Sequence, residues 1–361
     1  MNQQKVVISQ NLEEVLAAAV AECEHDRTFI LVDETTERCC LPVVDGMDCL
    51  NGAQIIVIGA SDTNKTLESL THVWEALGEG GATRHSLLIN IGGGMVTDLG
   101  GFAASTFKRG INYINIPTTL LAMVDASVGG KTGINFRGLK NEIGVFNNAS
   151  SVILDTIFLK TLDAENICSG YAEMLKHGLI SNEQMWAELL NFKLEALDYK
   201  LLQRMLADSV AVKQRIVTED PLEQGIRKAL NLGHTIGHAF ESFALQGKNP
   251  PPTGGVRGGH PILHGYAVAY GLISELYLST IKTGFPSDKM HQTVNFIKEH
   301  YGKMTITCDD YPILLELMTH DKKNVAGTIN FTLLGGIGDI RINQAATKED
   351  IYEALDFYRE C

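Results

Sequence analysis

The amino-acid sequence predicts an α/β domain followed by an α-helical domain, on the basis of three observations. Short β-branched runs alternate with helical patterns through the first half of the chain. Beyond about residue 166 the pattern changes to long amphipathic helical segments. The 361 residues also exceed the usual size of one domain. We therefore expect two domains, at residues 1–165 and 166–361.

The first domain should be built on a mainly parallel sheet. Its strand-like runs are residues 28–32, 54–60, 85–94, 111–117 and 151–155, and its clearest helical patterns are residues 11–23 and 66–81. Strands that alternate with helices pair in parallel, because each helix carries the chain back to the same end of the sheet. Most of these runs are apolar on both faces, as buried parallel strands are.

The second domain should be mainly helical. Amphipathic helical patterns occupy residues 183–197, 200–217 and 287–302. One segment, residues 246–261, is rich in proline and glycine, which do not continue a helix. We expect that segment to form a surface loop.

The composition excludes several classes of protein. Apolar residues make up 45% of the chain and charged residues 20%, which is typical of a globular protein and not of a disordered, fibrous or membrane one. The first residues lack the pattern of a signal peptide, and no apolar run reaches membrane-spanning length. The seven cysteines contain no C-x-x-C pair and fit reduced thiols better than a disulfide framework. We therefore expect a cytoplasmic protein.

The net charge of −13 limits the possible partners. Such a charge repels nucleic acid and anionic membranes, so we expect neither as a partner. A phosphorylated substrate would need a local cluster of cations. Cationic residues do gather near the motifs described below, namely Lys108, Arg109, Lys131, Lys140, Lys176, Lys213, Arg227, Lys322 and Lys323. Each alone is more simply explained as solvated surface charge, but together they can form a pocket for phosphate and carboxylate groups.

A glycine-rich turn follows one of the predicted strands. In LLINIGGGMVTDLGG the strand runs directly into Gly92, Gly93 and Gly94 and then into a helical pattern. This arrangement points backbone N–H groups and the positive end of a helix at a pyrophosphate. Thr97 stands where the third glycine of the dinucleotide-binding pattern is usual, so a plain tight turn remains an alternative.

A second glycine cluster only superficially resembles a phosphate-binding P-loop. ASVGGKTGIN contains Gly130, Lys131 and Thr132, but Asp125 stands where that motif needs its first glycine. We therefore reject a nucleotide triphosphatase.

Histidines and a glutamate in the second half have the spacing of metal ligands. His234 and His238 are four residues apart in LNLGHTIGHAFE and so share one face of a helix. The metalloprotease pattern would need Glu at Thr235. Glu173 lies upstream in SGYAEMLKHG, beside Lys176 and His177, and His264 lies downstream. Two histidines with one carboxylate leave an open position, as in catalytic metal sites, although each histidine taken singly is more often structural.

The order of these motifs resembles the 3-dehydroquinate synthase family. The matching segments are residues 92–146, SGYAEMLKHGLI, GIRKALNLGHTIGHAFE, LHGYAVAYG and HDKKNVAG, and the likeness extends over roughly residues 30–340. The resemblance implies a Rossmann-like α/β domain that binds NAD, an α-helical domain that binds metal and substrate, an active site in the cleft between them, and a homodimer. It also implies zinc or cobalt as the metal and a phosphorylated sugar acid as the substrate.

The activity that the resemblance implies combines NAD, metal and a cationic pocket. The family converts 3-deoxy-D-arabino-heptulosonate 7-phosphate to 3-dehydroquinate and phosphate by transient oxidation, phosphate elimination, re-reduction, ring opening and intramolecular aldol closure. NAD is therefore recycled within each turnover.

Carried over by motif, the implied metal ligands are Glu173, His234 and His264. The implied cofactor-binding residues are Asp33, Asp62, Lys65, Gly93, Gly94, Met95, Asp98, Thr118, Thr119, Asp125, Lys140, Phe158, Thr161 and Leu162. The implied substrate-binding residues are Arg109, Asp125, Lys131, Asn141, Lys176, Lys213, Arg227, Asn231, His238, Lys322 and Lys323. Of these, Lys131, Lys176, Arg227, Asn231 and His238 are the expected catalytic residues, and Arg109 is expected to reach the phosphate of a partner subunit.

The sequence departs from the family pattern at three places. Asp62 replaces a usual Glu, and Tyr266 replaces a Glu after the His-Gly step of the third ligand motif. The proline- and glycine-rich segment carries His260, which is an alternative ligand to His264. Which of Lys322 and Lys323 meets the substrate is also open.

Three other functions remain as alternatives. A glycerol-dehydrogenase-like enzyme shares this architecture but has no use for the cationic cluster. A sister cyclase that makes an inosose or a valiolone is disfavoured by the resemblance. It implies an acid-bearing substrate, because the chain retains Lys131, Lys140, Asn141, Arg227, Asp321, Lys322 and Lys323. An inactive NAD or metabolite sensor is disfavoured because no residue needed for the chemistry is missing.

Overall fold

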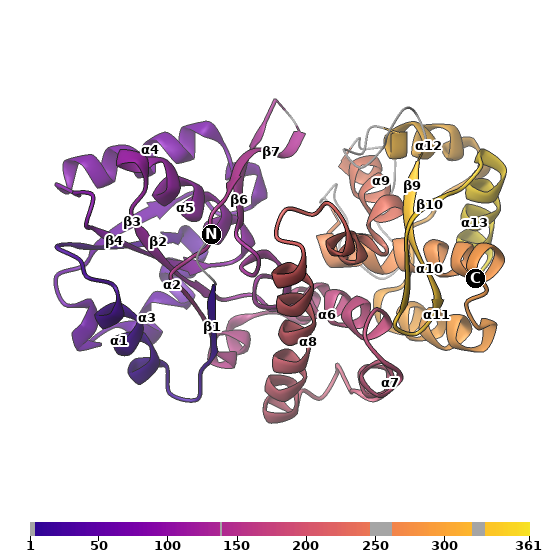
Figure 1. The fold of residues 1–361 in the computed structure, drawn as a ribbon, viewed down its shortest axis with the longest axis horizontal. Helices are drawn as coiled ribbons and strands as arrows, with labels where there is room; N and C mark the ends of the chain where they lie inside the picture. The colour runs from indigo at the N-terminus through magenta and orange to yellow at the C-terminus, as the bar shows by residue number, and fades with distance from the viewer. Residues whose placement is uncertain (1–3, 138, 246–261, 320–328) are drawn as a thin grey trace. The chain divides into compact units, whose positions relative to one another are not determined.

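The computed structural model describes residues 4–137, 139–245, 262–319 and 329–361. The chain forms two compact units, drawn in Figure 1. We call Met1–Asp163 with Tyr199–Gln214 the α/β unit, and Ala164–Asp198 with Arg215–Cys361 the helical unit. Helix α8 (Tyr199–Glu219) is thus divided between them. The division of roles between an NAD domain and a metal domain stays a prediction.

A six-stranded parallel sheet forms the centre of the α/β unit, which confirms the predicted fold class. The strand order is β1-β8-β5-β4-β2-β3. The five predicted runs are all strands, and β1 is added at one edge. Their bounds are Lys5–Ile8 for β1, Thr28–Asp33 for β2, Gln54–Ile58 for β3, Leu87–Gly92 for β4, Asn112–Pro117 for β5 and Ser151–Leu154 for β8.

Helices cover both faces of this sheet. In Figure 1, α4 and α5 lie on one side of the strands, and α1 and α3 lie on the other. The α-helices of this unit are α1 (Leu12–Glu22), α2 (Glu34–Cys39), α3 (Leu41–Val44), α4 (Leu67–Glu79) and α5 (Gly94–Thr106). The short 3-10 and π turns are η1 (Asp48–Leu50), η2 (Asp62–Asn64), η3 (Phe107–Arg109), η4 (Ala122–Ala126) and η5 (Thr156–Thr161).

The strand order reverses between β2 and β4. The chain passes from β2 outward to β3, whereas from β4 it passes in the opposite direction to β5. In parallel sheets, ligands bind beyond the carboxyl ends of the strands at such a switch point. Asp33 ends β2 and Gly92 ends β4, so the predicted glycine turn stands at the switch point.

An antiparallel hairpin, which the sequence pattern did not predict, follows β5. It consists of β6 (Lys131–Phe136) and β7 (Leu139–Phe146). Gly130 and Lys131 therefore lead into a strand and not into a helix, as the rejection of a P-loop requires. Apolar side chains of the hairpin remain exposed, namely Phe136, Leu139, Ile143, Val145 and Phe146.

The helical unit is mainly helical, as predicted, but it also contains a hairpin. Strands β9 (Asn330–Gly336) and β10 (Asp339–Ala345) pair antiparallel. The helices are α6 (Ala164–Leu179), α7 (Glu183–Asn191), η6 (Ile226–Asn231), α9 (His234–Leu245), α10 (His264–Thr283), α11 (Ser287–Tyr301), η7 (Cys308–Asp310), α12 (Tyr311–Thr319) and α13 (Lys348–Glu360).

One predicted helix is shorter than its pattern. Residues 183–197 were expected to be helical throughout, but α7 ends at Asn191. Phe192 is extended, and its ring stacks on Tyr171 with the centroids 5.6 Å apart. The Tyr171 hydroxyl also donates a 2.7 Å hydrogen bond to the Leu189 carbonyl. Packing against Tyr171 therefore ends the helix where the apolar periodicity alone would continue it.

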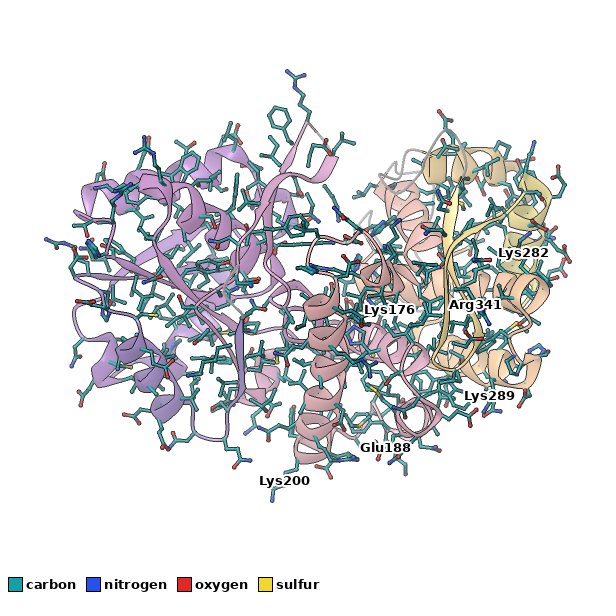
Figure 2. All side chains as sticks on the ribbon, viewed as in Figure 1. Lys176, Glu188, Lys200, Lys282, Lys289 and Arg341 are labelled. Atoms are coloured by element: carbon teal, nitrogen blue, oxygen red, sulfur yellow. The ribbon has the colours of Figure 1, made fainter. Side chains whose placement is uncertain are left out.

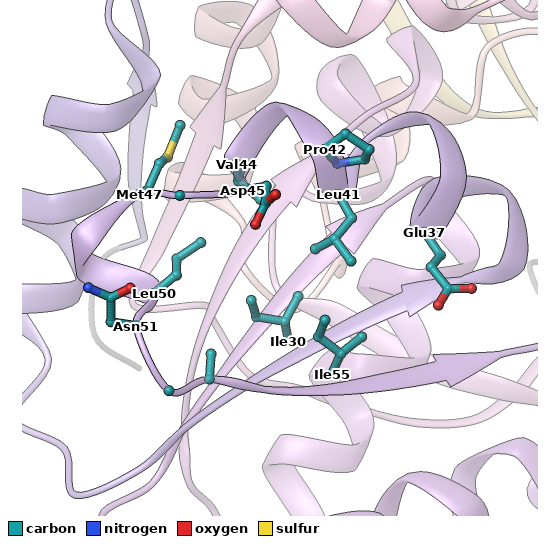
Figure 3. Close-up of a pocket in the computed structure, with 13 residues that line it drawn as sticks. Ile30, Glu37, Leu41, Pro42, Val44, Asp45, Met47, Leu50, Asn51 and Ile55 are labelled. Carbon is teal, nitrogen blue, oxygen red and sulfur yellow. The ribbon is translucent and has the colours of Figure 1, made fainter.

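A shallow groove at the edge of the α/β sheet does not coincide with any predicted site. Ile30, Leu41 and Ile55 line it, and Glu37 and Asp45 stand at its rim (Figure 3). Ile30 and Ile55 belong to the middle and the start of their strands, away from the carboxyl ends. The groove is therefore no part of the switch-point site.

Two further features of the described residues concern membrane-spanning helices and cysteines. None of the helices is both long and apolar enough to cross a bilayer. All seven cysteines lie in the described part of the chain, and all are free thiols.

Candidate metal centre and nucleotide site

Three helices of the helical unit bring a glutamate and two histidines together. Glu173 lies in the middle of α6, while His234 and His264 are the first residues of α9 and α10. The Nε2 atoms of His234 and His264 lie 3.4 Å and 3.5 Å from Oε1 of Glu173. Residues that are far apart in the sequence thus converge on one carboxylate oxygen.

Glycines allow these helices to approach so closely. A Cβ on Gly271 of α10 would overlap the carbonyl oxygen of Gly233, just before α9. A Cβ on Gly265, next to His264, would overlap the Ser169 carbonyl of α6. The Gly265 N–H also donates a 3.1 Å hydrogen bond to the Ser169 hydroxyl. Backbone contact at these points is what places the ligand-bearing ends of the helices side by side.

The imidazole of His234 is oriented for ligation. Its Nδ1 lies 3.0 Å from the Leu232 carbonyl oxygen, which only accepts, so Nδ1 carries the proton and Nε2 is the bare nitrogen. Burial lowers the pKa of His234 to about 4, so its ring is neutral near neutral pH. A neutral imidazole with a fixed tautomer is the form that binds metal.

His238 belongs to the same cluster. One ring nitrogen from each of His234, His238 and His264 lies within 4.8 Å of the others. The ring centroids are 5.3 Å to 5.8 Å apart. The structure therefore brings the third histidine of the predicted set next to the two predicted ligands.

Glu173 is a fully buried carboxylate with no hydrogen bond from any described residue. Burial alone would raise its pKa, but the Lys176 ammonium and His234 more than offset this, so the pKa lies well below its ordinary value. Lys176 forms an ion pair with Glu173 and is itself fully buried, whereas Lys200 and Arg341, also labelled in Figure 2, are exposed. An ionised, buried oxygen without hydrogen bonds fits a metal cation, because burying a charge is costly unless it is compensated.

Glu241 completes the surroundings of His264, and the sequence reasoning did not single it out. Its Oε2 lies 3.6 Å from Nδ1 of His264. Burial lowers the pKa of His264, but Glu173 and Glu241 raise it further, to about 10. Glu241 follows His238 by three residues on α9, so helical spacing could have identified it.

Two other predicted residues lie in the 3-10 turn just before α9. Arg227 is buried and donates from Nη1 to the Pro221 carbonyl at 2.6 Å. Asn231 donates from its side-chain amide to Oε1 of Glu223 at 3.0 Å. No motif identified Glu223, because it lies in the irregular segment between α8 and the 3-10 turn.

The glycine turn of the α/β unit leads directly into α5. Gly93 is the N-cap residue, and no side chain among the described residues caps this helix. The first N–H groups of α5 are thus oriented as in an anion site. A Cβ on Gly100 would overlap the Asn90 side chain of β4, so Gly100 takes over the close helix–strand contact that the third glycine usually provides. The sequence reasoning missed Gly100 because it lies outside the expected spacing.

The predicted cofactor residues follow the carboxyl ends of the parallel strands. Asp33 ends β2 and caps α2 through a capping box with Thr36. The Thr118 N–H donates to the Gly92 carbonyl at 2.9 Å, which ties the end of β5 to the glycine turn. Met95, Thr119, Phe158, Thr161 and Leu162 also lie in segments that follow β4, β5 or β8.

Ion pairs connect several of the predicted cofactor and substrate residues. The Lys65 ammonium lies 2.5 Å from a carboxylate oxygen of Asp98 and 2.5 Å from the Asn141 amide oxygen. Burial raises the pKa of Asp98, although Lys65 opposes that shift. Lys140 lies 3.3 Å from Asp62 at the surface. These predicted residues are therefore partners of each other.

The remaining cations differ in their burial. Lys213 is buried and donates to the Asp125 carbonyl oxygen at 2.5 Å, and it also pairs with the Asp125 carboxylate. Lys131 is exposed at the start of β6. Arg109 is exposed and has a left-handed φ of 72°. Lys322, Lys323 and the alternative ligand His260 lie outside the described residues.

Comparison with known families finds two matching family models. Residues 55–169 match the 3-dehydroquinate synthase N-terminal model, and residues 170–324 match the 3-dehydroquinate synthase C-terminal model. Together they cover well over half of the chain.

Individual proteins agree with these models. A 3-dehydroquinate synthase of Parabacteroides distasonis is 54% identical over 360 residues, which is 100% of this chain and 99% of the relative. A solved 2-epi-5-epi-valiolone synthase from Streptomyces hygroscopicus, with NAD+ and Zn2+ bound, is 25% identical, with a TM-score of 0.83 over 100% of this chain and 98% of that one. A solved 2-deoxy-scyllo-inosose synthase in complex with carbaglucose-6-phosphate, NAD+ and Co2+ is 22% identical, with a TM-score of 0.81 over 98% and 96%.

Proposed function

The chain belongs to the 3-dehydroquinate synthase family, and we propose that Glu173, His234 and His264 hold the divalent metal that its reaction uses. The protein is a carbon–oxygen lyase that converts 3-deoxy-D-arabino-heptulosonate 7-phosphate to 3-dehydroquinate and phosphate, a step of aromatic biosynthesis. The much higher identity to a 3-dehydroquinate synthase than to an inosose or valiolone synthase favours this substrate over those of the sister cyclases.

One observation supports the metal site above all others. The buried carboxylate of Glu173 accepts no hydrogen bond from the described residues, and two imidazole nitrogens face one of its oxygens at 3.4 Å and 3.5 Å. One oxygen and two nitrogen donors are the ligand types of zinc and of cobalt in catalytic sites, with a position left open for substrate. His238 stands beside this set and is the candidate for contact with the substrate.

When bound, the metal would supply Lewis-acid polarisation of a hydroxyl group on the substrate ring, and NAD would supply reversible hydride transfer at the carbon that bears this hydroxyl. In the helical unit, Lys176 and Arg227 are the buried cations that would bind and orient an anionic substrate. His238 and Asn231 would hold or move protons on the ring hydroxyls. Lys131, at the start of β6, is exposed and would take part in the same proton transfers.

The α/β unit is proposed to hold NAD at the glycine turn. Gly93 and Gly94 allow the backbone of α5 to approach a pyrophosphate, and the helix start is free of a side-chain cap among the described residues. Asp33, at the end of β2, stands where an acidic side chain meets a ribose in this type of sheet. The other predicted cofactor residues keep the roles that the family implies.

We also propose a cytoplasmic homodimer. The seven free thiols suit a reducing compartment. The apolar side chains exposed on the β6–β7 hairpin suit burial against another surface. Sedimentation equilibrium of the pure protein tests the dimer, and a monomer at micromolar concentration would contradict it.

The proposed chemistry is tested by its stoichiometry. Protein incubated with NAD, Zn2+ or Co2+ and 3-deoxy-D-arabino-heptulosonate 7-phosphate should release phosphate and dehydroquinate in equal amounts. Absorbance at the NADH band should not rise, because each hydride returns to the substrate. Continuous NADH production would instead indicate a dehydrogenase of the glycerol-dehydrogenase type, and a lack of any metal dependence would refute the ligand assignment.

A further inference from the structure

A second buried carboxylate lies near the metal cluster and is not one of its proposed ligands. Glu275 of α10 is fully buried. Its Oε2 accepts a 2.6 Å hydrogen bond from the Gly233 N–H, and its Oε1 accepts a 3.0 Å hydrogen bond from the Ile236 N–H. Burying a carboxylate is costly unless its oxygens are compensated in this way, so the position of Glu275 requires α9 to keep its place.

The N–H groups of Gly233 and Ile236 occupy the two positions whose N–H groups donate to side-chain partners in a capping box. His234 begins α9, so Gly233 is the N-cap residue and Ile236 is the third helical residue. In a capping box, side chains at these same two positions bond each other's N–H groups. Gly233 has no side chain and has a φ of +78°, which glycine adopts readily. Glu275 therefore caps α9 from the neighbouring helix, with its charge at the positive end of the helix dipole.

The first turn of α9, which Glu275 caps, carries the proposed metal ligand His234. His234 stands between the two bonded N–H groups in the sequence, and Glu275 is on the same helix as His264. His264 and Glu275 are eleven residues apart on α10, about three turns, so they lie on the same face. Glu275, on the helix of His264, thus forms hydrogen bonds to the first turn of the helix that carries His234.

Glycine backbone forms part of the contact between α9 and α10. Where α9 packs on α10, Gly237 lies against the Ala267 carbonyl, and Gly233 lies against Gly271 and the Leu272 side chain. The glycines permit the two backbones to approach closely at these points. The two hydrogen bonds to Glu275 are directional, so they fix the position of the first turn of α9 along the axis of α10.

We propose that Glu275 is a positioning residue of the metal centre, which sets the distance between His234 and His264 by capping α9 from α10. This inference rests on the proposed function, because it assumes that those histidines bind the metal. Residues that orient metal ligands typically contribute 10- to 100-fold to metal affinity, about the size of effect expected here.

The test uses the full-length protein and Co2+ as the probe. Glu275→Gln keeps the shape and one acceptor oxygen but places an amide NH2 against the other N–H group, so one bond is lost. We expect Co2+ affinity, measured by competition with a chelator, to fall about 10- to 100-fold. The visible absorption bands of bound Co2+ should also shift, because the ligand geometry changes. The NAD affinity should stay at its wild-type value.

A matched control separates positioning from simple loss of a helix cap. Thr347 caps α13 in the same unit, where its hydroxyl accepts from the Asp350 N–H at 3.2 Å. Thr347→Ala should lower the Tm but leave the Co2+ affinity and spectrum unchanged. If Glu275→Gln lowers only the Tm, like the control, the inference is wrong.

A second variant covers the case in which Glu275→Gln does not fold. Glu275→Asp keeps the charge but shortens the reach, so it should also weaken Co2+ binding and shift the spectrum. Wild-type affinity and spectrum in Glu275→Asp would overturn the inference. Failure of the wild-type protein itself to bind Co2+ would instead overturn the proposed metal site, so the two failures are distinguishable.

Discussion

The two units of this protein differ in how their buried charged residues are arranged. In the helical unit, the carboxylate oxygens of Glu173 accept no hydrogen bond from the described residues, and the histidines face them at more than hydrogen-bonding distance. In the α/β unit, Lys65 and Lys213 already pair with Asp98 and Asp125. Glu173 also pairs with Lys176, but the three proposed metal ligands already converge, whereas the proposed anion-binding cations of the α/β unit are each bound to a carboxylate.

This difference indicates two kinds of preorganisation. A metal site gains affinity when its donors already converge, and the ion pair with Lys176 offsets part of the cost of burying the Glu173 charge. Buried cations are costly without a partner, and in the α/β unit Lys65 and Lys213 are each paired with an acid of the same unit. Four predictions test the contrast, from the largest expected effect to the smallest.

The largest effect is expected from removing a proposed metal ligand. Glu173→Gln or His234→Ala should remove bound metal and lower phosphate release at least about a thousandfold, since a Lewis acid contributes several kcal/mol to the barrier. Metal content by mass spectrometry and phosphate release measure the two effects. Glu165→Gln, an exposed glutamate on the same helix, is the control and should change neither. A Glu173 or His234 variant that is metal-free and fully active would contradict the assignment.

The next effect concerns the ion pair of the α/β unit. Lys65→Met leaves the carboxylate of Asp98 buried without its partner, and the Asp98 side chain is only 18% exposed. We expect the free energy of unfolding of this unit to fall by about 3 kcal/mol. Trp74 lies in this unit and Trp186 in the other, so Trp74 fluorescence in a Trp186→Phe background follows the relevant transition. Adding Asp98→Asn should recover most of the loss, and an equal loss in the double variant would argue against the pair.

A smaller effect is expected at the glycine turn. In Gly93→Ala the new Cβ would lie 3.3 Å from the Thr119 methyl, which the fold can accommodate with a small shift. The methyl group would however occupy space needed by the pyrophosphate, so NAD affinity should fall by about 1 to 3 kcal/mol. Titration with NAD measures the change, and Co2+ affinity should not alter. The control is Gly78→Ala in α4, where a Cβ meets open space and NAD affinity should stay unchanged.

The smallest effect concerns the number of protons that the protein releases when it binds metal. Glu173 and Glu241 outweigh burial and raise the pKa of His264 to about 10, so this ring carries a proton at pH 7.5 in the metal-free protein. A metal ligand must be neutral, so binding should release about one proton, and affinity should rise with pH up to about pH 10. Calorimetry of Co2+ binding in two buffers of different ionisation enthalpy gives the count. A binding heat independent of buffer would show that His264 is already neutral.

Much of the fold and part of the site could be predicted from local patterns. The β-branched runs predicted the strands of the parallel sheet because a strand buried on both faces leaves a continuous apolar run. Helical spacing predicted that His234 and His238 share a face, and a glycine-rich run after a strand predicted the turn at Gly93. Motif resemblance nominated Glu173 and His264 as partners of His234. Each of these signals is encoded within a few consecutive residues.

Other features were decided only by the tertiary structure. Helix α7 ends early because Tyr171 packs against its end. The β6–β7 and β9–β10 hairpins were not predicted, although β10 alternates in exposure along its length. The cap that Glu275 provides, the contact of Glu241 with His264 and the pairing of Lys65 with Asp98 join residues 23 to 42 positions apart. Such contacts leave no periodic trace in the chain, because their energy depends on how two folded elements meet and not on the residues beside each partner.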